Sequence, residues 1–110
     1  MNCSFIIPAY NEEKFLKKTV ESLRESIVGA KIISSGEIIV VDNCSTDRTA
    51  EIAKNIGVNL VNEPVRQISR ARNAGARHAK GDILFFIDAD TSIEVDHLTV
   101  ACEEILKEKA

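Results

Sequence analysis

Two aspartates separated by one residue follow a run of apolar residues in the last third of this sequence. Residues 83–87 are consecutively apolar, a pattern typical of a strand buried on both faces of a parallel sheet. Asp88 and Asp90 come directly after this run, where open α/β sheets bind their ligands. In an extended segment, residues i and i+2 point the same way, roughly 6.5 Å apart. The pair therefore predicts a site where two carboxylates share one hard cation.

Such a cation would serve a phosphorylated ligand. A diphosphate carries several negative charges and becomes more negative as it leaves a glycosyl or phosphoryl centre. A divalent metal held by carboxylates neutralises that charge and acts as a Lewis acid. An all-oxygen site suits Mg²⁺ or Mn²⁺, with water and phosphate oxygens completing the coordination. Asp-x-Asp alone is a weak signal, and its place after a buried strand strengthens it.

Strands and helices alternate along the sequence. Apolar runs predict strands at residues 4–7, 37–41, 58–61 and 83–87. Periodic apolar positions predict helices at about 12–28, from 45 or 46 to 57, 68–80 and 95–107. Asn11 is the expected N-cap of the first helix, and Ser45 or Thr46 that of the second. This alternation predicts right-handed βαβ units in one α/β domain, with helices on both faces of a parallel sheet.

Composition limits the class of protein. The 110 residues contain no apolar stretch near the roughly 18 to 20 residues that a transmembrane helix needs, and no secretory signal begins the sequence. The cysteines, Cys3, Cys44 and Cys102, form no Cys-x-x-Cys pair, which a reducing cytosol explains most simply. We therefore expect a cytoplasmic location, with peripheral attachment at the inner membrane surface as the alternative.

Basic residues are concentrated in one segment. Residues 64–81 hold five of the 14 Lys and Arg side chains and no acid, although the net charge of the chain is −3. A local basic segment in an acidic protein favours a small anionic ligand over nucleic acid, which needs a broadly basic face. Arg70 and Arg72 could reach diphosphate oxygens. A solvated helix face would explain the same charges.

Polar clusters follow three of the expected strands, at residues 8–13, 42–47 and 88–90. In a parallel sheet these carboxyl ends share one edge, so the clusters should converge. Three independent helix caps would use similar residues.

Individual residues of these clusters suggest parts of a nucleotide site. Asp42 could accept hydrogen bonds from a base or a ribose hydroxyl, or it could form a structural turn. Tyr10 could stack on a base or pack at the strand end. Glu12 is more often an acid that compensates a helix dipole than a ligand.

At this point the residues resemble those of the family 2 glycosyltransferases. Residues 4–12 are similar to the opening strand and Pro-x-Tyr-Asn-Glu loop of that family, and residues 40–47 to its Val-Asp-Asp-Gly-Ser-x-Asp segment. Residues 69–75 resemble its Ala-Arg-Asn-x-Gly helix start, and residues 86–90 its Phe-x-Asp-Ala-Asp metal motif. The motifs occur in order and cover most of the chain.

The resemblance implies the N-terminal half of a GT-A fold, a Rossmann-like sheet with strand order 3-2-1-4. It also implies a divalent metal, Mg²⁺ or Mn²⁺, and a UDP- or GDP-linked sugar as donor. Asp88 and Asp90 would hold the metal, and Arg72 rather than Arg66 or Arg77 would lie near the diphosphate. The implied donor-binding residues are Pro8, Ala9, Tyr10, Glu12, Asp42, Asn43, Arg72, Asp88, Ala89 and Asp90.

Two features depart from the family pattern. Asn43 and Cys44 replace the usual second Asp and the Gly; Asn43 keeps an acceptor oxygen without the charge, and Cys44 is less comfortable than glycine at positive φ. The chain also continues only about 20 residues beyond Asp90, so we expect a single domain, residues 1–110, that is incomplete relative to the family domain. The acceptor and the general base stay unassigned.

Three functions remain open. The chain could be the donor-binding part of a glycosyltransferase, or a nucleotide-sugar-binding module without turnover, in which self-association covers a bare sheet edge. It could also be a haloacid-dehalogenase-type phosphatase, whose Asp-x-Asp-x-Thr/Val motif Asp88 to Ser92 nearly matches.

Overall fold

The fold is a parallel sheet with helices on both faces, seen in a computed structural model that describes residues 1–109. The strands are β1 (Asn2–Ala9), β2 (Ser35–Asp42), β3 (Asn59–Asn62) and β4 (Ile83–Phe86). The helices are α1 (Leu16–Gly29), α2 (Thr49–Asn55), α3 (Ile68–His78) and α4 (Val95–Lys109). All pairings are parallel and the order is β3-β2-β1-β4. The α/β class and the strand order expected from the resemblance are both confirmed.

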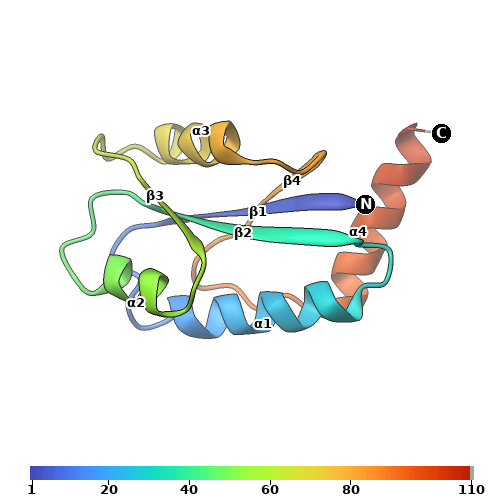
Figure 1. Ribbon diagram of the computed structural model, residues 1–110, viewed down its shortest axis with the longest axis horizontal. Coiled ribbons are helices and arrows are strands. Elements are labelled where there is room, and N and C mark those ends of the chain that lie inside the picture. Colours follow the sequence, from blue (N-terminus) through green and yellow to red (C-terminus); the bar gives the residue numbers. More distant parts are fainter. Residues whose placement is uncertain (110) are drawn as a thin grey trace.

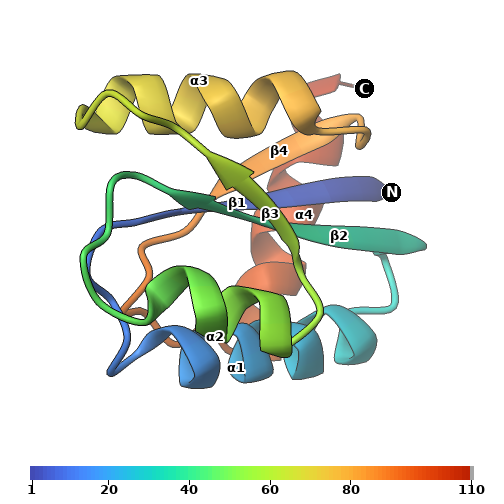
Figure 2. The ribbon, with the colours of Figure 1, turned by 60° about the vertical axis from the view of Figure 1, so that its left-hand side comes forward.

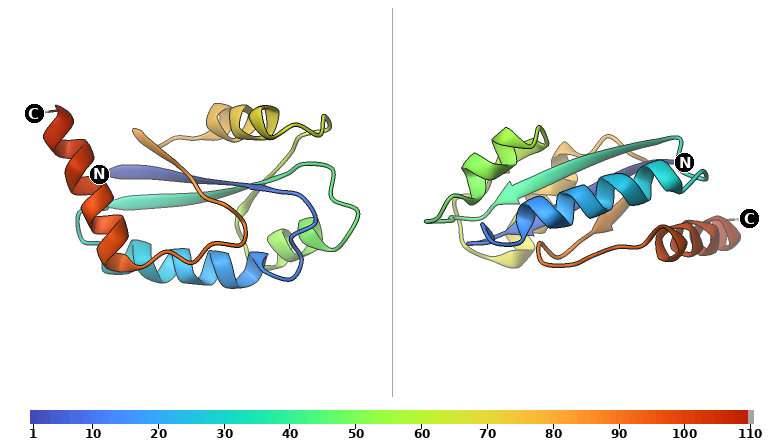
Figure 3. Two further views of the ribbon diagram at one scale, coloured as in Figure 1. Left: turned by 180° about the vertical axis from the view of Figure 1, so that it is seen from behind. Right: turned by 90° about the horizontal axis from the view of Figure 1, so that it is seen from below.

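The elements form three layers (Figures 1 and 2). Helix α3 covers one face of the sheet, and α1 and α2 cover the other (Figure 2). Helix α4 packs against α1 and lies beside the end of the sheet where β1 begins (Figure 3). Among residues 1–109, no helix combines the length and apolarity that crossing a bilayer requires.

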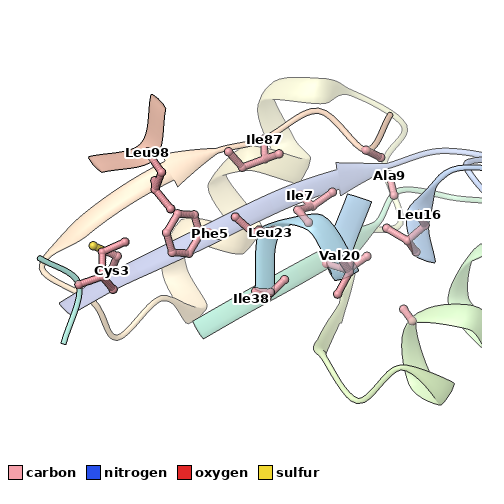
Figure 4. Packing of buried hydrophobic residues seen from close by; sticks show 14 of the residues in the cluster. Cys3, Phe5, Ile7, Ala9, Leu16, Val20, Leu23, Ile38, Ile87 and Leu98 are labelled. Atoms are coloured by element: carbon pink, nitrogen blue, oxygen red, sulfur yellow. The ribbon is translucent and has the colours of Figure 1, made fainter. Parts of the chain in front are cut away.

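Alternate residues of β1 face two separate cores. Phe5 and Ile7 pack with α1 and α4 in the larger core (Figure 4), and Ile6 packs against α3 in the smaller one. This follows from the two-residue period of a strand. The larger core includes Leu23 of α1 and Leu98 of α4. Strand β1 is thus held from both sides, which fixes the loop that follows it.

Strand β4 differs from the prediction. Leu84 is 39% exposed and Phe86 46% exposed, so this strand is not buried on both faces. Strand β4 is at the edge of the sheet, and α3 packs over β1, β2 and β3. Only Ile83 and Phe85 pack against the larger core. The apolar run predicted a strand correctly but not its burial, because burial depends on which strands the helix covers.

The first two helices begin later than predicted. Asn11 does not cap α1; it has φ 51°, and its Oδ1 accepts a hydrogen bond from Thr46 N at 2.8 Å. Helix α1 begins at Leu16. Helix α2 begins at Thr49, whose N–H donates to Asp47 Oδ1 at 2.9 Å, so the expected caps Ser45 and Thr46 are not used in that role. The polar residues that a sequence pattern assigns to caps here join two loops instead.

A partly buried hydrogen-bond network ties β1, β2 and the segment before β4 together near the amino end of the sheet. Glu37 Oε2 accepts hydrogen bonds from Ser4 Oγ at 2.5 Å and from Lys80 N at 2.6 Å. Gly81 N donates to Ser4 Oγ at 2.8 Å. Burial alone would raise the pKa of Glu37, but the hydrogen bonds from Ser4 and Lys80 outweigh it, and the pKa lies below its ordinary value.

Glu37→Gln tests this network through pH. Because the folded-state pKa is lowered, the ionised carboxylate stabilises the fold above the ordinary glutamate pKa, and this contribution is lost as the pH falls through the folded-state value. We therefore expect the original chain to be more stable than Glu37→Gln at neutral pH, with the difference shrinking in acid. Urea unfolding of both proteins across this pH range measures it. A difference that stays constant with pH would contradict the assignment.

Candidate functional site

An open pocket of about 470 Å³ lies at the carboxyl edge of the sheet. Its lining comes from the ends of β1, β2 and β4 and from the segment before α3: Pro8, Ala9, Tyr10, Glu12, Asn43, Arg66, Gln67, Ile68, Asp88, Ala89 and Asp90. The parallel register explains the convergence, since Ala9 pairs with Asp42 and Ile6 with Phe86, placing the strand ends side by side. Eight of the ten residues expected from sequence line this one pocket.

The two aspartates sit in a turn rather than in an extended segment. Strand β4 ends at Phe86, and Thr91 N donates to Asp88 O at 3.1 Å. Both carboxylates are exposed, whereas Ala89 between them is buried and its carbonyl accepts a hydrogen bond from Thr19 Oγ1 at 2.6 Å. Helix α1 therefore anchors the turn from behind and leaves Asp88 and Asp90 on the side of the pocket.

Glu12 belongs to the same acidic cluster. Burial raises the pKa of Glu12 above its ordinary value, and the negative charges of Asp90, Asp47 and Asp88 raise it further. The raised pKa of Glu12 indicates that the electrostatic potential around Glu12, Asp88 and Asp90 is negative. A negative potential favours the binding of a cation.

Glu12→Gln should therefore stabilise the chain at neutral pH. A raised folded-state pKa means that ionisation costs stability above that value, and the cost disappears below the ordinary value near 4.5. We expect the variant to unfold at higher urea concentration at neutral pH and to match the original chain in acid. A variant that is less stable at neutral pH would show that Glu12 is held by favourable contacts instead.

The donor set suits a hard divalent cation that shares its coordination with a ligand. Within residues 1–109 no group of three or more His, Cys, Asp or Glu side chains could hold a metal. Asp88 and Asp90 would supply two carboxylates, and Mg²⁺ and Mn²⁺ accept such partial sites when phosphate and water oxygens complete the shell. The residues present therefore fit a metal that binds together with a diphosphate.

Hydrogen bonds brace the β1–α1 loop against the β2–α2 loop. Asn11 N donates to Ser45 Oγ and Glu12 N to Thr49 Oγ1, both at 2.9 Å. Thr46 N donates in the other direction, to Asn11 Oδ1. These contacts fix the backbone on both sides of the Tyr10 and Glu12 side chains without using either of them.

Two expected site residues do not line the pocket. Asp42 is 7% exposed, and its Oδ1 accepts a hydrogen bond from Ser45 N at 3.2 Å, which is the structural-turn alternative. The Arg72 guanidinium carbon lies 6.0 Å from the ring centroid of Phe86, on α3. Their roles in donor binding remain predictions.

Sequence reasoning missed Arg66, Gln67 and Ile68. The guanidinium carbon of Arg66 lies 3.7 Å from the ring centroid of Tyr10, a cation–π geometry. The basic segment at residues 64–81 contained the signal, but the resemblance pointed to Arg72.

The backbone of Cys44 adopts the conformation expected of the glycine that it replaces. Cys44 has φ 69°, the left-handed conformation that glycine would adopt without strain.

The sequence matches the family model described as "Glycosyl transferase family 2" over residues 4–110. A curated relative, 4,4'-diaponeurosporenoate glycosyltransferase of Staphylococcus haemolyticus, is 38% identical over 97% of this chain and 28% of its own length. Dolichyl-phosphate beta-glucosyltransferase ALG5D of Trichomonas vaginalis is 34% identical over 94% of this chain and 35% of its own length. The chain thus spans about a third of these relatives.

Solved structures agree with the sequence comparisons. Staphylococcus aureus TarS, residues 1–349, solved with UDP-GlcNAc, superposes with a TM-score of 0.78 at 27% identity, over 97% of this chain and 32% of TarS. The mannosyltransferase PcManGT of Pyrobaculum calidifontis, solved with GDP-Man and Mn²⁺, has a TM-score of 0.74 at 28% identity, over 93% of this chain and 31% of its own. With a family match that covers nearly every residue, this chain belongs to glycosyl transferase family 2.

Proposed function

We propose that this chain is the donor-binding part of a glycosyltransferase, which transfers a sugar from a nucleoside diphosphate sugar to an acceptor with the help of a divalent metal. The observation that carries the proposal is the shared pocket: the loop after β1 and the turn after β4 bring Tyr10, Glu12, Asp88 and Asp90 together. An aromatic ring and an acidic metal-binding edge in one pocket match the two ends of a nucleoside diphosphate.

Different pocket residues would contact the base and the diphosphate of the donor. Tyr10 would stack on the base, with Pro8 and Ala9 beside it. Asn43, with Asp42 behind it, would shape the base and ribose end of the pocket without contacting the ligand itself. Asp88 and Asp90 would hold Mg²⁺ or Mn²⁺ against the diphosphate. When bound, the metal would neutralise the charge that develops on the leaving diphosphate. Arg66 lines the pocket and Arg72 does not, so Arg66 is the better candidate for a cationic contact to the donor.

The base and the sugar of the donor are the finer part of the proposal. TarS has been solved with UDP and UDP-GlcNAc, and PcManGT with GDP-Man and Mn²⁺. Uracil and guanine share carbonyl acceptors, so a cationic edge next to Tyr10 suits either. The family match argues against the phosphatase alternative for Asp88 and Asp90.

A nucleotide panel tests the proposal. A ligand that binds only the folded state raises the melting midpoint by mass action, so UDP or GDP with Mn²⁺ should stabilise the chain more than either nucleotide or Mn²⁺ alone. Calorimetry with UDP-glucose and GDP-mannose, run beside an assay for released sugar, separates donor turnover from binding without turnover. No stabilisation by any nucleoside diphosphate would overturn the proposal.

A further inference from the structure

The segment before α3 is fastened by the two residues that depart from the family pattern. Asn43 Nδ2 donates to Glu63 O at 3.0 Å and to Val65 O at 2.8 Å. Because a carbonyl oxygen only accepts hydrogen bonds, these contacts identify the nitrogen as the atom that faces the segment. Cys44 Sγ lies 3.1 Å from Pro64 O and 3.5 Å from Glu63 O. We call residues 63–65 the clamped segment.

Arg66 is the next residue after the clamped segment and reaches the pocket. Its guanidinium lies over the ring of Tyr10, and within the described chain no ion pair includes it. A guanidinium is planar and stacks on aromatic rings, and its N–H donors stay free to bind a ligand. Arg66 and Tyr10 therefore form one wall of the pocket, and the guanidinium gives that wall a positive charge.

We propose that Asn43 is a positioning residue of the donor pocket: through the clamped segment it holds Arg66 over Tyr10, and the stacked pair is the wall against which the base of the nucleoside diphosphate lies. The second half of this statement rests on the proposed function. The first half concerns only contacts within the chain and can be tested without any ligand.

The chemistry of residue 43 explains why the departure from aspartate matters. A carboxylate has no N–H donor, so an aspartate here would place its negative charge against two carbonyl oxygens. Asn43 is only 5% exposed, so water could not replace the lost donors at low cost. The clamp therefore requires the amide, and Asn43→Asp removes it with almost no change in volume.

Tyr10 is a built-in probe, since the chain has one tyrosine and no tryptophan. Chains labelled at tyrosine should give NMR ring signals from Tyr10 alone. We would compare the original chain with Asn43→Asp, Arg66→Met and the double variant. Both single variants should shift the ring signals by loss of the guanidinium, and the double variant should not shift them further than Arg66→Met. Ring signals in Asn43→Asp that match the original chain would overturn the proposal.

A measurement on the original chain covers the case in which Asn43→Asp does not fold. The side-chain amide protons of Asn43 should exchange with solvent far more slowly than those of Asn73, which is exposed on α3. Arg66 side-chain protons should also give cross-relaxation to the Tyr10 ring. The proposal would be overturned if the side-chain amide protons of Asn43 exchanged as fast as those of Asn73 and no cross-relaxation linked Arg66 to Tyr10.

Nucleotide affinity then tests whether the base of the nucleoside diphosphate lies against Arg66 and Tyr10. With Mn²⁺ present, Asn43→Asp and Arg66→Met should each weaken UDP or GDP binding about tenfold, the scale of one stacking contact, and the double variant should bind no more weakly than Arg66→Met. A double variant that is clearly weaker would mean that the added carboxylate repels the ligand directly, which contradicts positioning. If the original chain binds no nucleotide, the proposed function fails, while the ring signals still decide the clamp.

Discussion

Replacing Asp88 and Asp90 together by alanine is expected to remove the Mn²⁺-dependent part of nucleoside diphosphate binding. Both side chains are exposed, line the pocket and are among the few groups there that could contact a cation. Without them the metal has no protein ligand at the turn, so UDP or GDP should bind the variant equally with and without Mn²⁺. Calorimetry of the original and variant chains with each nucleotide measures the change.

The matched control carries the same change in charge elsewhere. Glu103 and Glu108 are exposed on α4, which lies beside the other end of the sheet. Replacing both by alanine should leave Mn²⁺-dependent binding intact. The pocket assignment fails if the aspartate variant retains full Mn²⁺ dependence, or if the control loses it as completely. Because Asp88 and Asp90 are exposed and contribute no packing, we expect both variants to keep the melting midpoint of the original chain within a few degrees.

Gly81→Ala is expected to have the largest effect on stability. A Cβ at Gly81 would lie 2.7 Å from the backbone carbonyl carbon of Cys3 and from the backbone nitrogen and Oγ of Ser4. The two backbone atoms belong to β1, which is buried between two cores, and the Ser4 hydroxyl is held by its hydrogen bond to Glu37, so these atoms cannot move aside as a free side chain could. Overpacking that forces the backbone to shift typically costs about 1–3 kcal/mol and occasionally more, and we expect Gly81→Ala to lie at the upper end of that range. Urea unfolding gives the change in free energy.

Gly29→Ala provides the comparison. The three atoms nearest to a Cβ there all belong to the half-buried side chain of Val95, the closest at 2.9 Å, and Gly29 itself is exposed. Alanine also has the higher helix propensity, by up to about 1 kcal/mol in a helix interior. Gly29 is the last residue of α1, so a part of this gain offsets the close contact. We expect Gly29→Ala to change stability by less than about 1 kcal/mol. Equal losses in the two variants would show that the contact of Gly81 with β1 is not the cause.

The strands show which parts of the fold a local pattern can predict. The apolar runs of β1 and β2 predicted strands, and both lie at the centre of the sheet, covered on each face. The run at β4 is as apolar, yet Leu84 and Phe86 are exposed, because α3 packs mainly over β1, β2 and β3. Local apolarity predicts that a segment pairs, whereas its position in the sheet decides how much of it is covered.

The candidate site shows the same division. That the strand ends converge followed from parallel pairing alone, and the structure brings Tyr10, Glu12 and both aspartates to one pocket. The sequence predicts Asn11 and Ser45 or Thr46 as helix caps, but these residues join the first two loops. A cap and a loop-to-loop contact use the same residue types, so only the distance between the loops distinguishes them.

By itself, the sequence determined the alternation of elements, the parallel sheet and the edge where chemistry-bearing residues gather, because these depend on local periodicity and on the polarity of parallel strands. Tertiary structure alone decided which arginine reaches the pocket. Arg66 and Arg72 lie in the same basic segment, and the path of residues 63–65, held by the amide of Asn43, turns the first toward Tyr10 while helix α3 sets the second beside Phe86. Contacts between residues 20 positions apart leave no periodic trace in a sequence, so this choice could be seen only in the folded chain.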